Sequence, residues 1–332
     1  MNAVRGEARG VRRQSQAVAA VALLAASVGV SAQGFPTKPI RIIVPSTPGG
    51  SVDTLSRAVG NHLSERWGQQ IVVDNRSGAG GVIAAELAAK APPDGYTLIM
   101  GTIASIATNV SLTRNLPYDP VRDFAPITQV AGQQLILLVH PAVAAKSVAE
   151  LTVLAKAKPG HLSFASAGNG SGGHLSGELY KILASIDLLH VPYKGVAPAL
   201  VDVISGQVTM TFSSIISGAP HVKSGKVRGL AVTGARRSVA FPDLPTMAES
   251  GVKGYESSTW YGLLAPKATP RPVIMKIHDE VVVMLKQPAT RDRLLAEGAE
   301  PVGNTPEQFA AFIQSEIDKW GKVIRTAGLK AE

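Results

Sequence analysis

Two loops rich in glycine and serine offer the clearest chemistry in this sequence. They are residues 45–51 (Pro-Ser-Thr-Pro-Gly-Gly-Ser) and residues 166–174 (Ser-Ala-Gly-Asn-Gly-Ser-Gly-Gly-His). Each follows a β-branched run and precedes apolar residues at helical spacing, so each is expected between a strand and a helix, where open α/β sheets bind ligands. Unpaired N–H groups and the helix dipole attract an anion there, and glycine lets the backbone approach it.

The side chains of these loops indicate which anion they suit. Hydroxyl groups are supplied by Ser46, Thr47, Ser51, Ser166 and Ser171. Neither loop contains arginine or lysine, so a carboxylate held by amides, hydroxyls and water is a better match than a doubly charged phosphate. The alternative is that both loops are ordinary tight turns with capping serines.

Other polar residues stand at strand or helix ends on the same side of the predicted sheets. Asp53 favours the dipole at the start of the first helix, or binds the amine of an amino-acid-like ligand. Tyr193 and Lys194 end a strand and supply a stacking face and a positive charge, or else pair with surface groups. Further candidates end the third strand of each predicted lobe: Thr102, Ser213 and Ser214.

Three rival chemistries match less of the sequence. Residues 168–173 satisfy the Gly-x-Gly-x-x-Gly dinucleotide fingerprint, but residues 191–194 (Val-Pro-Tyr-Lys) lack the acidic residue expected after the next strand. No serine lies in a Gly-x-Ser-x-Gly nucleophile turn. His174 and Glu178 are one helical turn apart, but no further ligand pair joins them. We therefore expect no catalytic residue, metal or cofactor, and a secreted serine-dependent hydrolase remains the competing class.

Short β-branched runs alternate with amphipathic stretches, which predicts an α/β fold with mainly parallel sheets. The pattern occurs twice. Strands are expected at 39–44, 71–73 and 96–100, and again at 162–165, 188–191 and 208–212. Each repeat is followed by connecting strands, predicted at 124–130, 135–140, 227–232 and 259–265. The spacing predicts two similar lobes joined by a hinge, with a final helix that begins at a Thr305-Pro306-Glu307-Gln308 capping box.

The N-terminus predicts export. Four arginines precede an uncharged run at 17–30 and small residues at 30–32, the layout of a signal peptide over residues 1–32. A twin-arginine signal is the minor alternative. The chain has no cysteine, so a lipid anchor at the mature N-terminus is excluded, and we expect a protein free in the periplasm.

Charge and length bound the remaining possibilities. The formal charge of +9 becomes +6 without residues 1–32, which carry four arginines and Glu7. No polybasic run stands out, so this charge favours anionic ligands, and no nucleic-acid partner is expected. About 300 mature residues exceed a single core. We predict lobe 1 from 36–130 and 229–332, and lobe 2 from 131–228.

Long stretches of the mature chain resemble the Bug family, the TctC-like periplasmic receptors of tripartite tricarboxylate transporters. The resemblance rests on PTKPIRIIVPSTPGGSVDTLSRAVG, DNRSGAGGVIAAELAAKAPPDGYTLIMG, LPYDPVRDFAPITQV, HLSFASAGNGSGGHLSGELYK, HVPYKG and FPDLPTMAESG. It implies a type II periplasmic-binding-protein fold whose two lobes close on a ligand. This chain departs from the family's usual pattern at Ser46, where an aromatic residue is usual, and at Gly172-Gly173, where a proline-serine pair is usual.

The resemblance also implies which residues bind the ligand. They fall on the two loops: Ser46, Thr47, Pro48, Gly49, Gly50, Ser51, Ser166, Ala167, Gly168, Gly170, Ser171 and His174. It implies a small carboxylate gripped partly through ordered water, no catalysis, and delivery to membrane permease subunits, with sensing for a signalling system as an open alternative. We expect a monomer.

Overall fold

The computed structural model describes residues 34–326, 328 and 329. The predicted signal peptide therefore lies outside the described residues. The chain divides into two units, residues 1–35 and 36–332, and the helices and strands described lie in the second. In the described part of the chain, no helix has the length and apolar character that crossing a bilayer requires.

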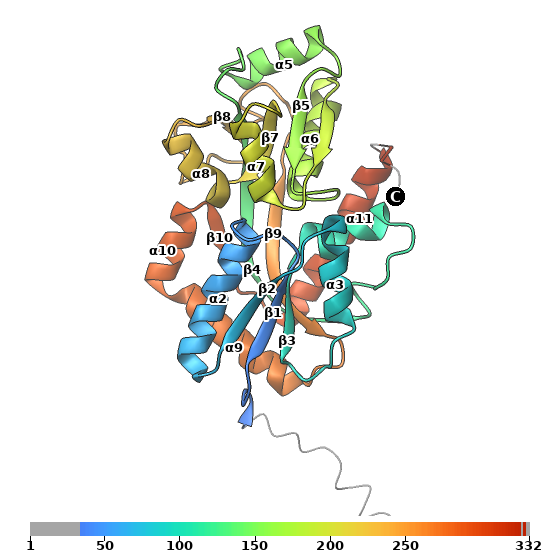
Figure 1. Ribbon diagram of the computed structural model, residues 1–332, viewed down its shortest axis with the longest axis vertical. Helices are drawn as coiled ribbons and strands as arrows, with labels where there is room; N and C mark the ends of the chain where they lie inside the picture. Colours follow the sequence, from blue (N-terminus) through green and yellow to red (C-terminus); the bar gives the residue numbers. More distant parts are fainter. Residues whose placement is uncertain (1–33, 327, 330–332) are drawn as a thin grey trace, which may run out of the picture. The chain divides into compact units, whose positions relative to one another are not determined.

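The first predicted repeat forms three parallel strands in the order β2-β1-β3. Two helices follow the first two strands (Figure 1). The bounds are β1 (Ile40–Val44), α2 (Ser51–Trp67), β2 (Ile71–Asn75), α3 (Val82–Ala89) and β3 (Thr97–Thr102). Helix α2 forms because apolar residues recur on one face, where Val52, Leu55, Val59 and Leu63 are buried.

The second repeat folds with the same connectivity. Its strands are parallel in the order β6-β5-β7, and helices again follow the first two. The bounds are β5 (Ser163–Ser166), α6 (Gly172–Ala184), β6 (Leu189–Pro192), α7 (Val196–Ile204) and β7 (Met210–Ser214). The duplication predicted from sequence spacing is thus present in both strand order and helix placement.

Two long strands connect the repeats and run antiparallel to the strands they join (Figure 1). They are β4 (Phe124–Val139) and β9 (Ser258–Pro266). Strand β4 pairs with β9 up to Gln134 and with β7 from Leu135 onward, so one strand serves both sheets. The sequence predicted two separate strands here. The structure joins them because Gln133 and Gln134 stay paired with β9.

The remaining elements cover these sheets. They are η2 (Ala79–Gly81), the π-helical turn η3 (Ala104–Thr108), α4 (Asn109–Leu112), α5 (Val148–Ala157), α8 (Ile215–Lys223), β8 (Arg228–Val232), α9 (Arg271–Lys286), α10 (Pro288–Ala296), β10 (Ala299–Pro301) and α11 (Pro306–Thr326). The capping box is confirmed, since Gln308 N donates to Thr305 Oγ1 at 3.2 Å and Thr305 N donates to Gln308 Oε1 at 3.0 Å.

The segment after β7 differs from the predicted lobe division, which returned it to lobe 1 at residue 229. Strand β8 pairs with β4 in the second sheet, and Met247, Val252 and Tyr255 pack in the core beneath that sheet. Sequence pattern shows that a strand is apolar but not which sheet it joins. We therefore propose that the chain returns to the first lobe at β9.

Candidate functional site

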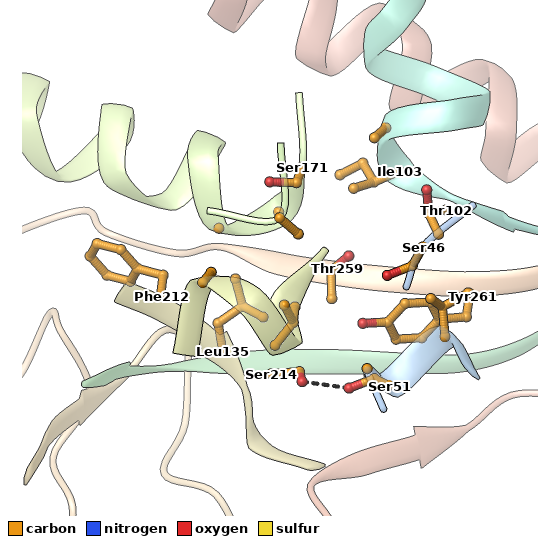
Figure 2. Close-up of a pocket in the computed structure, with 18 of the residues that line it drawn as sticks. Ser46, Ser51, Thr102, Ile103, Leu135, Ser171, Phe212, Ser214, Thr259 and Tyr261 are labelled. Carbon is orange, nitrogen blue, oxygen red and sulfur yellow. Dashed lines mark hydrogen bonds between the residues drawn. The ribbon is translucent and has the colours of Figure 1, made fainter. Parts of the chain in front are cut away.

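A pocket lies between the two sheets, where the strand ends of both repeats face each other (Figure 2). It leaves about 80 Å³ for the centres of water-sized groups. That space is several times the roughly 10–15 Å³ that one water needs, so a small organic molecule fits. Its lining consists of Pro45, Ser46, Gly50, Ser51, Val52, Gly80, Thr102, Ile103, Ala104, Leu135, Ala167, Ser171, Gly172, Gly173, Val196, Ala199, Thr211, Phe212, Ser214, Thr259 and Tyr261.

The pocket is rich in helix N-termini. The first residues of α2, α6 and α7 line it, as does Ser214, the N-cap of α8. No side chain caps α2 at Gly50 or α7 at Gly195, so their leading N–H groups remain available to a ligand. None of the lining side chains is charged. The field in the pocket therefore comes from peptide dipoles and favours a small anion.

Hydroxyl groups form a bridge across the pocket. Ser51 Oγ, on α2 in the first lobe, donates to Ser214 Oγ in the second lobe at 2.5 Å (Figure 2). Ser214 Oγ in turn donates to Ser217 Oγ at 2.9 Å. Tyr261, on the connecting strand β9, turns its hydroxyl toward the pocket beside Ser51 and Thr259 (Figure 2). The two lobes thus already touch through side chains at the site.

Tyr261 is a neutral hydrogen-bonding group here. Burial raises its pKa to about 12, although hydrogen bonds with Ser51 and Thr259 lower the pKa in part. Its hydroxyl also donates to Gln133 Oε1 at 3.3 Å. A group with so high a pKa keeps its proton at neutral pH, and it would donate that proton to an anion in place of Gln133.

Asp53 supports the first loop from behind and does not face the pocket. Its Oδ2 accepts from Gly49 N and from Arg57 Nε, both at 3.0 Å, and its Oδ1 accepts from Asn75 Nδ2 at 3.1 Å. Burial raises its pKa, but these hydrogen bonds outweigh burial and leave the pKa below its ordinary value. The carboxylate is already neutralised by Arg57, so the expectation that Asp53 binds a ligand amine is not supported by its contacts.

The second loop is held by two histidines, of which His174 is buried and His190 is partly buried. Gly170 N donates to His174 Nδ1 at 3.0 Å, and Ser166 Oγ lies 2.7 Å from His190 Nε2. The two imidazole rings stack with centroids 4.0 Å apart, and Phe164 stacks on His190 at 4.8 Å. These contacts fix the loop that carries Ser171 to the pocket.

Both histidines are neutral at ordinary pH. Burial, with a contribution from Lys181, lowers the pKa of His174 to about 4. Burial and the neighbouring His174 lower the pKa of His190 to about 3. Because Nδ1 of His174 accepts a hydrogen bond, its proton lies on Nε2, which is 3.9 Å from Glu178 Oε1.

His174 and Glu178 do not form a metal site with other residues. Glu178 Oε1 accepts from Lys181 Nζ at 3.0 Å. Among the described residues, no group of three histidine, aspartate or glutamate side chains is placed to hold a metal ion.

The structure brings only part of the predicted set to the pocket wall: Ser46, Gly50, Ser51, Thr102, Ala167, Ser171 and Ser214. The other predicted residues lie outside that wall: Thr47, Pro48, Gly49, Asp53, Ser166, Gly168, Gly170, His174, Tyr193, Lys194 and Ser213. Several of these support the wall, as Asp53 and His174 show. The Tyr193 hydroxyl donates to Asp202 Oδ2 at 2.5 Å, and Ser213 Oγ donates to the carbonyl of Ser214.

Sequence reasoning missed the part of the wall formed by the connecting strands and by α7. These residues are Leu135, Thr259 and Tyr261 on β4 and β9, and Val196 and Ala199 on α7. Tyr261 lies within the predicted strand 259–265, but its exposure to the pocket depends on how β9 crosses between lobes. No spacing in the sequence reveals that crossing.

The two glycines that depart from the usual family pattern have a packing reason. A Cβ at Gly173 would lie 2.7 Å from the carbonyl oxygen of Phe212, and one at Gly172 would lie 2.9 Å from Thr259 Cβ. Both distances are shorter than Cβ atoms tolerate. The start of α6 therefore sits against the pocket wall in a way that only glycine permits.

Comparisons with known proteins agree with this geometry. Residues 55–329 match the model of the tripartite tricarboxylate transporter family receptor. Protein BugT of Bordetella pertussis (strain Tohama I) is 37% identical over 302 residues, which are 91% of this chain and 93% of that protein. The solved structure of R. palustris Rpa4515 with adipate is 39% identical, with a TM-score of 0.88, and the match covers 90% of this chain and 100% of that one.

A second solved structure is MatC (Rpa3494) from Rhodopseudomonas palustris with bound malate. It is 33% identical with a TM-score of 0.83, and the match covers 87% of this chain and 100% of that one. The two-lobed fold expected from the resemblance, that of a type II periplasmic binding protein, is confirmed by these neighbours. The family-model match and the long alignments lead to one conclusion: the chain belongs to the tripartite tricarboxylate transporter receptor family.

Proposed function

We propose that this protein is a periplasmic receptor that binds a small carboxylate in the pocket between its lobes and releases it to the permease subunits of a tripartite transporter. The observation that carries this proposal is the pocket itself. Helix N-termini from both lobes and a row of hydroxyl groups face a space without a charged side chain. The two structural neighbours are Rpa4515 with adipate and MatC with bound malate, and both of these ligands are carboxylates.

The pocket favours a carboxylate over other small anions. Carboxylate oxygens only accept hydrogen bonds, and the pocket offers donors in the backbone of α2 and α6 and in the hydroxyl of Thr259. The hydroxyls of Ser51 and Tyr261 would donate to the ligand in place of Ser214 and Gln133. A phosphate with two charges would lack the arginine or lysine that such groups usually recruit. Water fills the remaining space and completes the contacts.

Binding would work through closure of the lobes. A ligand in contact with α2 in one lobe and α6 in the other makes more contacts when the lobes are closed than when they are open. It favours the closed state by that difference in binding free energy. The permease would then recognise the closed form. Export to the periplasm is supported by the layout of residues 1–32 and by the family.

A hydrolytic role has one structural feature in its favour, the pair of Ser166 and His190. Their side chains lie within hydrogen-bond distance, as a nucleophile and its base do. However, Ser166 is 1% exposed and does not line the pocket. With its pKa lowered to about 3, His190 is a poor base at neutral pH. We propose that the pair is structural and that the protein has no catalytic activity.

A thermal-shift screen tests the receptor function. Each dicarboxylate, tricarboxylate, aromatic acid and acidic amino acid is compared with its own amide, which keeps the shape but loses the negative charge. We expect at least one acid to raise the melting temperature as a bound ligand does, while its amide does not. If amides protect as well as acids, or if no carboxylate protects, recognition of a carboxylate by the pocket is wrong.

A fluorophosphonate reaction tests the enzyme alternative separately. We expect no covalent labelling of the folded protein, because the serines near the pocket lack an accessible base. Labelling of Ser46, Ser166 or Ser171, located by peptide mass spectrometry, would favour the hydrolase.

A further inference from the structure

A buried glutamine lies behind the hydroxyl group of Tyr261. Gln133 on β4 is opposite Thr259 on β9, and Ala131, two residues earlier on β4, is opposite Tyr261. Side chains two residues apart on a strand share one face of the sheet, so Gln133, Thr259 and Tyr261 point to the same side. Thr259 and Tyr261 line the pocket, whereas Gln133 is 2% exposed and does not line it. The glutamine can therefore act on a ligand only through its neighbours.

The side-chain amide of Gln133 is only partly satisfied. Its Oε1 accepts from the Tyr261 hydroxyl at 3.3 Å, which is longer than the roughly 2.5–3.0 Å usual for such a bond. Its Nε2 is buried and has no hydrogen-bond partner among the described residues. A buried donor without an acceptor is destabilising. The present orientation of the amide is thus held by one long hydrogen bond and opposed by an unpaired donor.

Half a turn about the last side-chain bond exchanges the two amide atoms. The amide nitrogen and oxygen are nearly equal in size, so the turned group fits the same space. Nε2 of Gln133 would then donate to the Tyr261 oxygen, and the tyrosine proton would be released for another acceptor. Because the Tyr261 hydroxyl faces the pocket (Figure 2), a bound carboxylate is placed to accept that proton.

A carboxylate that accepts from Tyr261 makes this turn favourable. Without the turn, Gln133 Oε1 would lose its donor while Nε2 still lacked an acceptor, so both buried atoms would be unpaired. After the turn only Oε1 is unpaired, and an unpaired carbonyl oxygen is tolerated better than an unpaired N–H. The donors would also form one chain, from Nε2 through the tyrosine hydroxyl to the anion, in which each hydrogen bond strengthens the next.

We propose that Gln133 is a positioning residue for ligand binding, whose amide turns when a carboxylate enters the pocket and then donates to Tyr261 as Tyr261 donates to the ligand. The inference rests on the proposed receptor function. It adds a residue outside the pocket wall that strengthens the hold of the pocket on an anion.

The sign of one mutational effect tests this role. Gln133→Met removes both polar amide atoms and keeps the length of the side chain. Isothermal titration calorimetry on the whole protein uses adipate, malate and any acid that raises the melting temperature in the thermal-shift screen. If the amide only accepted from Tyr261, its removal would release the tyrosine proton and tighten binding. We expect binding to weaken about fivefold instead, the factor for one hydrogen bond, because the donor chain is lost.

A double-mutant cycle assigns the effect to the chain of donors. In the Tyr261→Phe background, Gln133→Met should leave affinity unchanged, because the amide then has no hydroxyl to which it can donate. Gln129→Met makes the same change at a buried glutamine of the same strand, opposite Gly262, and serves as the matched control without effect on affinity.

Nitrogen-15 NMR gives a second reading if Gln133→Met does not fold. One glutamine side-chain NH₂ signal of the wild-type protein should shift when the acid is added. The same signal should stay in place in the Tyr261→Phe variant. A signal that shifts equally in both proteins, or in neither, contradicts the turn of the amide.

The outcomes separate the role of Gln133 from the receptor function. If Gln133→Met tightens binding, leaves it unchanged, or weakens it equally in the Tyr261→Phe background, the positioning role is wrong while the receptor function stands. A wild-type protein that binds no acid of the series contradicts the receptor function itself, and the role of Gln133 with it.

Discussion

The stacked histidine pair, His174 and His190, predicts that this protein loses stability in mild acid. Native His174 and His190 stay neutral because burial lowers their pKa to about 4 and about 3, whereas both are expected to titrate near the ordinary histidine pKa of 6.5 in the unfolded chain. Below pH of about 6.5 the unfolded state binds more protons than the native state, so protons favour unfolding. The stability is fully present above that pH and falls as pH decreases toward the native pKa values.

The size of the loss follows from these values. At pH of about 5, each unfolded imidazole lies about 1.5 pH units below its pKa while the native ring remains neutral. At 1.36 kcal/mol per pH unit, buried His174 therefore lowers the free energy of unfolding by about 2 kcal/mol there. His190 is only partly buried, so it adds a smaller loss. Typical proteins have total stabilities of only about 5–15 kcal/mol. Most carboxylates titrate near pH of about 4, so they contribute little in this window.

Urea unfolding at pH of about 7 and about 5 measures this loss. His174→Asn places an amide oxygen near the position of Nδ1, where it can still accept from Gly170 N, but removes the titration. We expect the variant to be less stable at neutral pH, because it loses the ring stack, but to lose about 2 kcal/mol less on acidification. His161→Gln, at an exposed position, is the control and should keep the wild-type pH dependence.

Two results would refute this reasoning. One is a wild-type protein whose free energy of unfolding changes by less than about 1 kcal/mol between these pH values, since the two lowered pKa values require more. The other is a His174→Asn variant whose acid loss equals that of wild type, because the titrating group would then lie elsewhere.

Two further changes test the pocket wall and the contact between lobes. Gly173→Ala should reduce stability by about 1–3 kcal/mol, because the new Cβ meets the carbonyl of Phe212 at 2.7 Å, whereas Gly132→Ala, with its nearest neighbour at 3.8 Å, should cost little in the same denaturation assay. Equal stability of the two variants would contradict the packing argument. Ser51→Ala removes the hydrogen bond to Ser214 across the cleft and should weaken ligand affinity, measured by calorimetry, about fivefold. This factor corresponds to about 1 kcal/mol, the net contribution of one hydrogen bond. Ser56→Ala, on the same helix but bonded only to Val52 O, should leave affinity unchanged, and a similar loss in both would show that α2 itself was disturbed.

The lobes meet at the site through direct bonds as well as through the space left for a ligand. Ser51 contacts Ser214, and Thr108 Oγ1 on η3 donates to the carbonyl of Gly170 at 2.8 Å. Such bonds lower the free energy of the closed arrangement before any solute arrives. A ligand therefore needs a smaller difference in affinity between the closed and the open form to keep the lobes closed.

Local pattern determined much of this protein. The alternation of β-branched runs with amphipathic stretches predicted the strands and helices of both repeats, because periodicity reports which face of each element is buried. The placement of glycine and serine predicted two loops at helix N-termini, and both loops contribute to the pocket. The Thr305 capping box marked the start of α11 because its hydrogen bonds are made within four residues.

Only the tertiary structure decided how the two halves combine. Strand β8 joins the second sheet, and β9 carries Tyr261 to the pocket, although neither placement has a local signal. Asp53 and His174 stand close to the pocket in sequence, yet their contacts turn them into supports of the loops. The physical reason is that burial and charge neutralisation depend on partners distant in the chain, and spacing along the sequence does not record which partners those are.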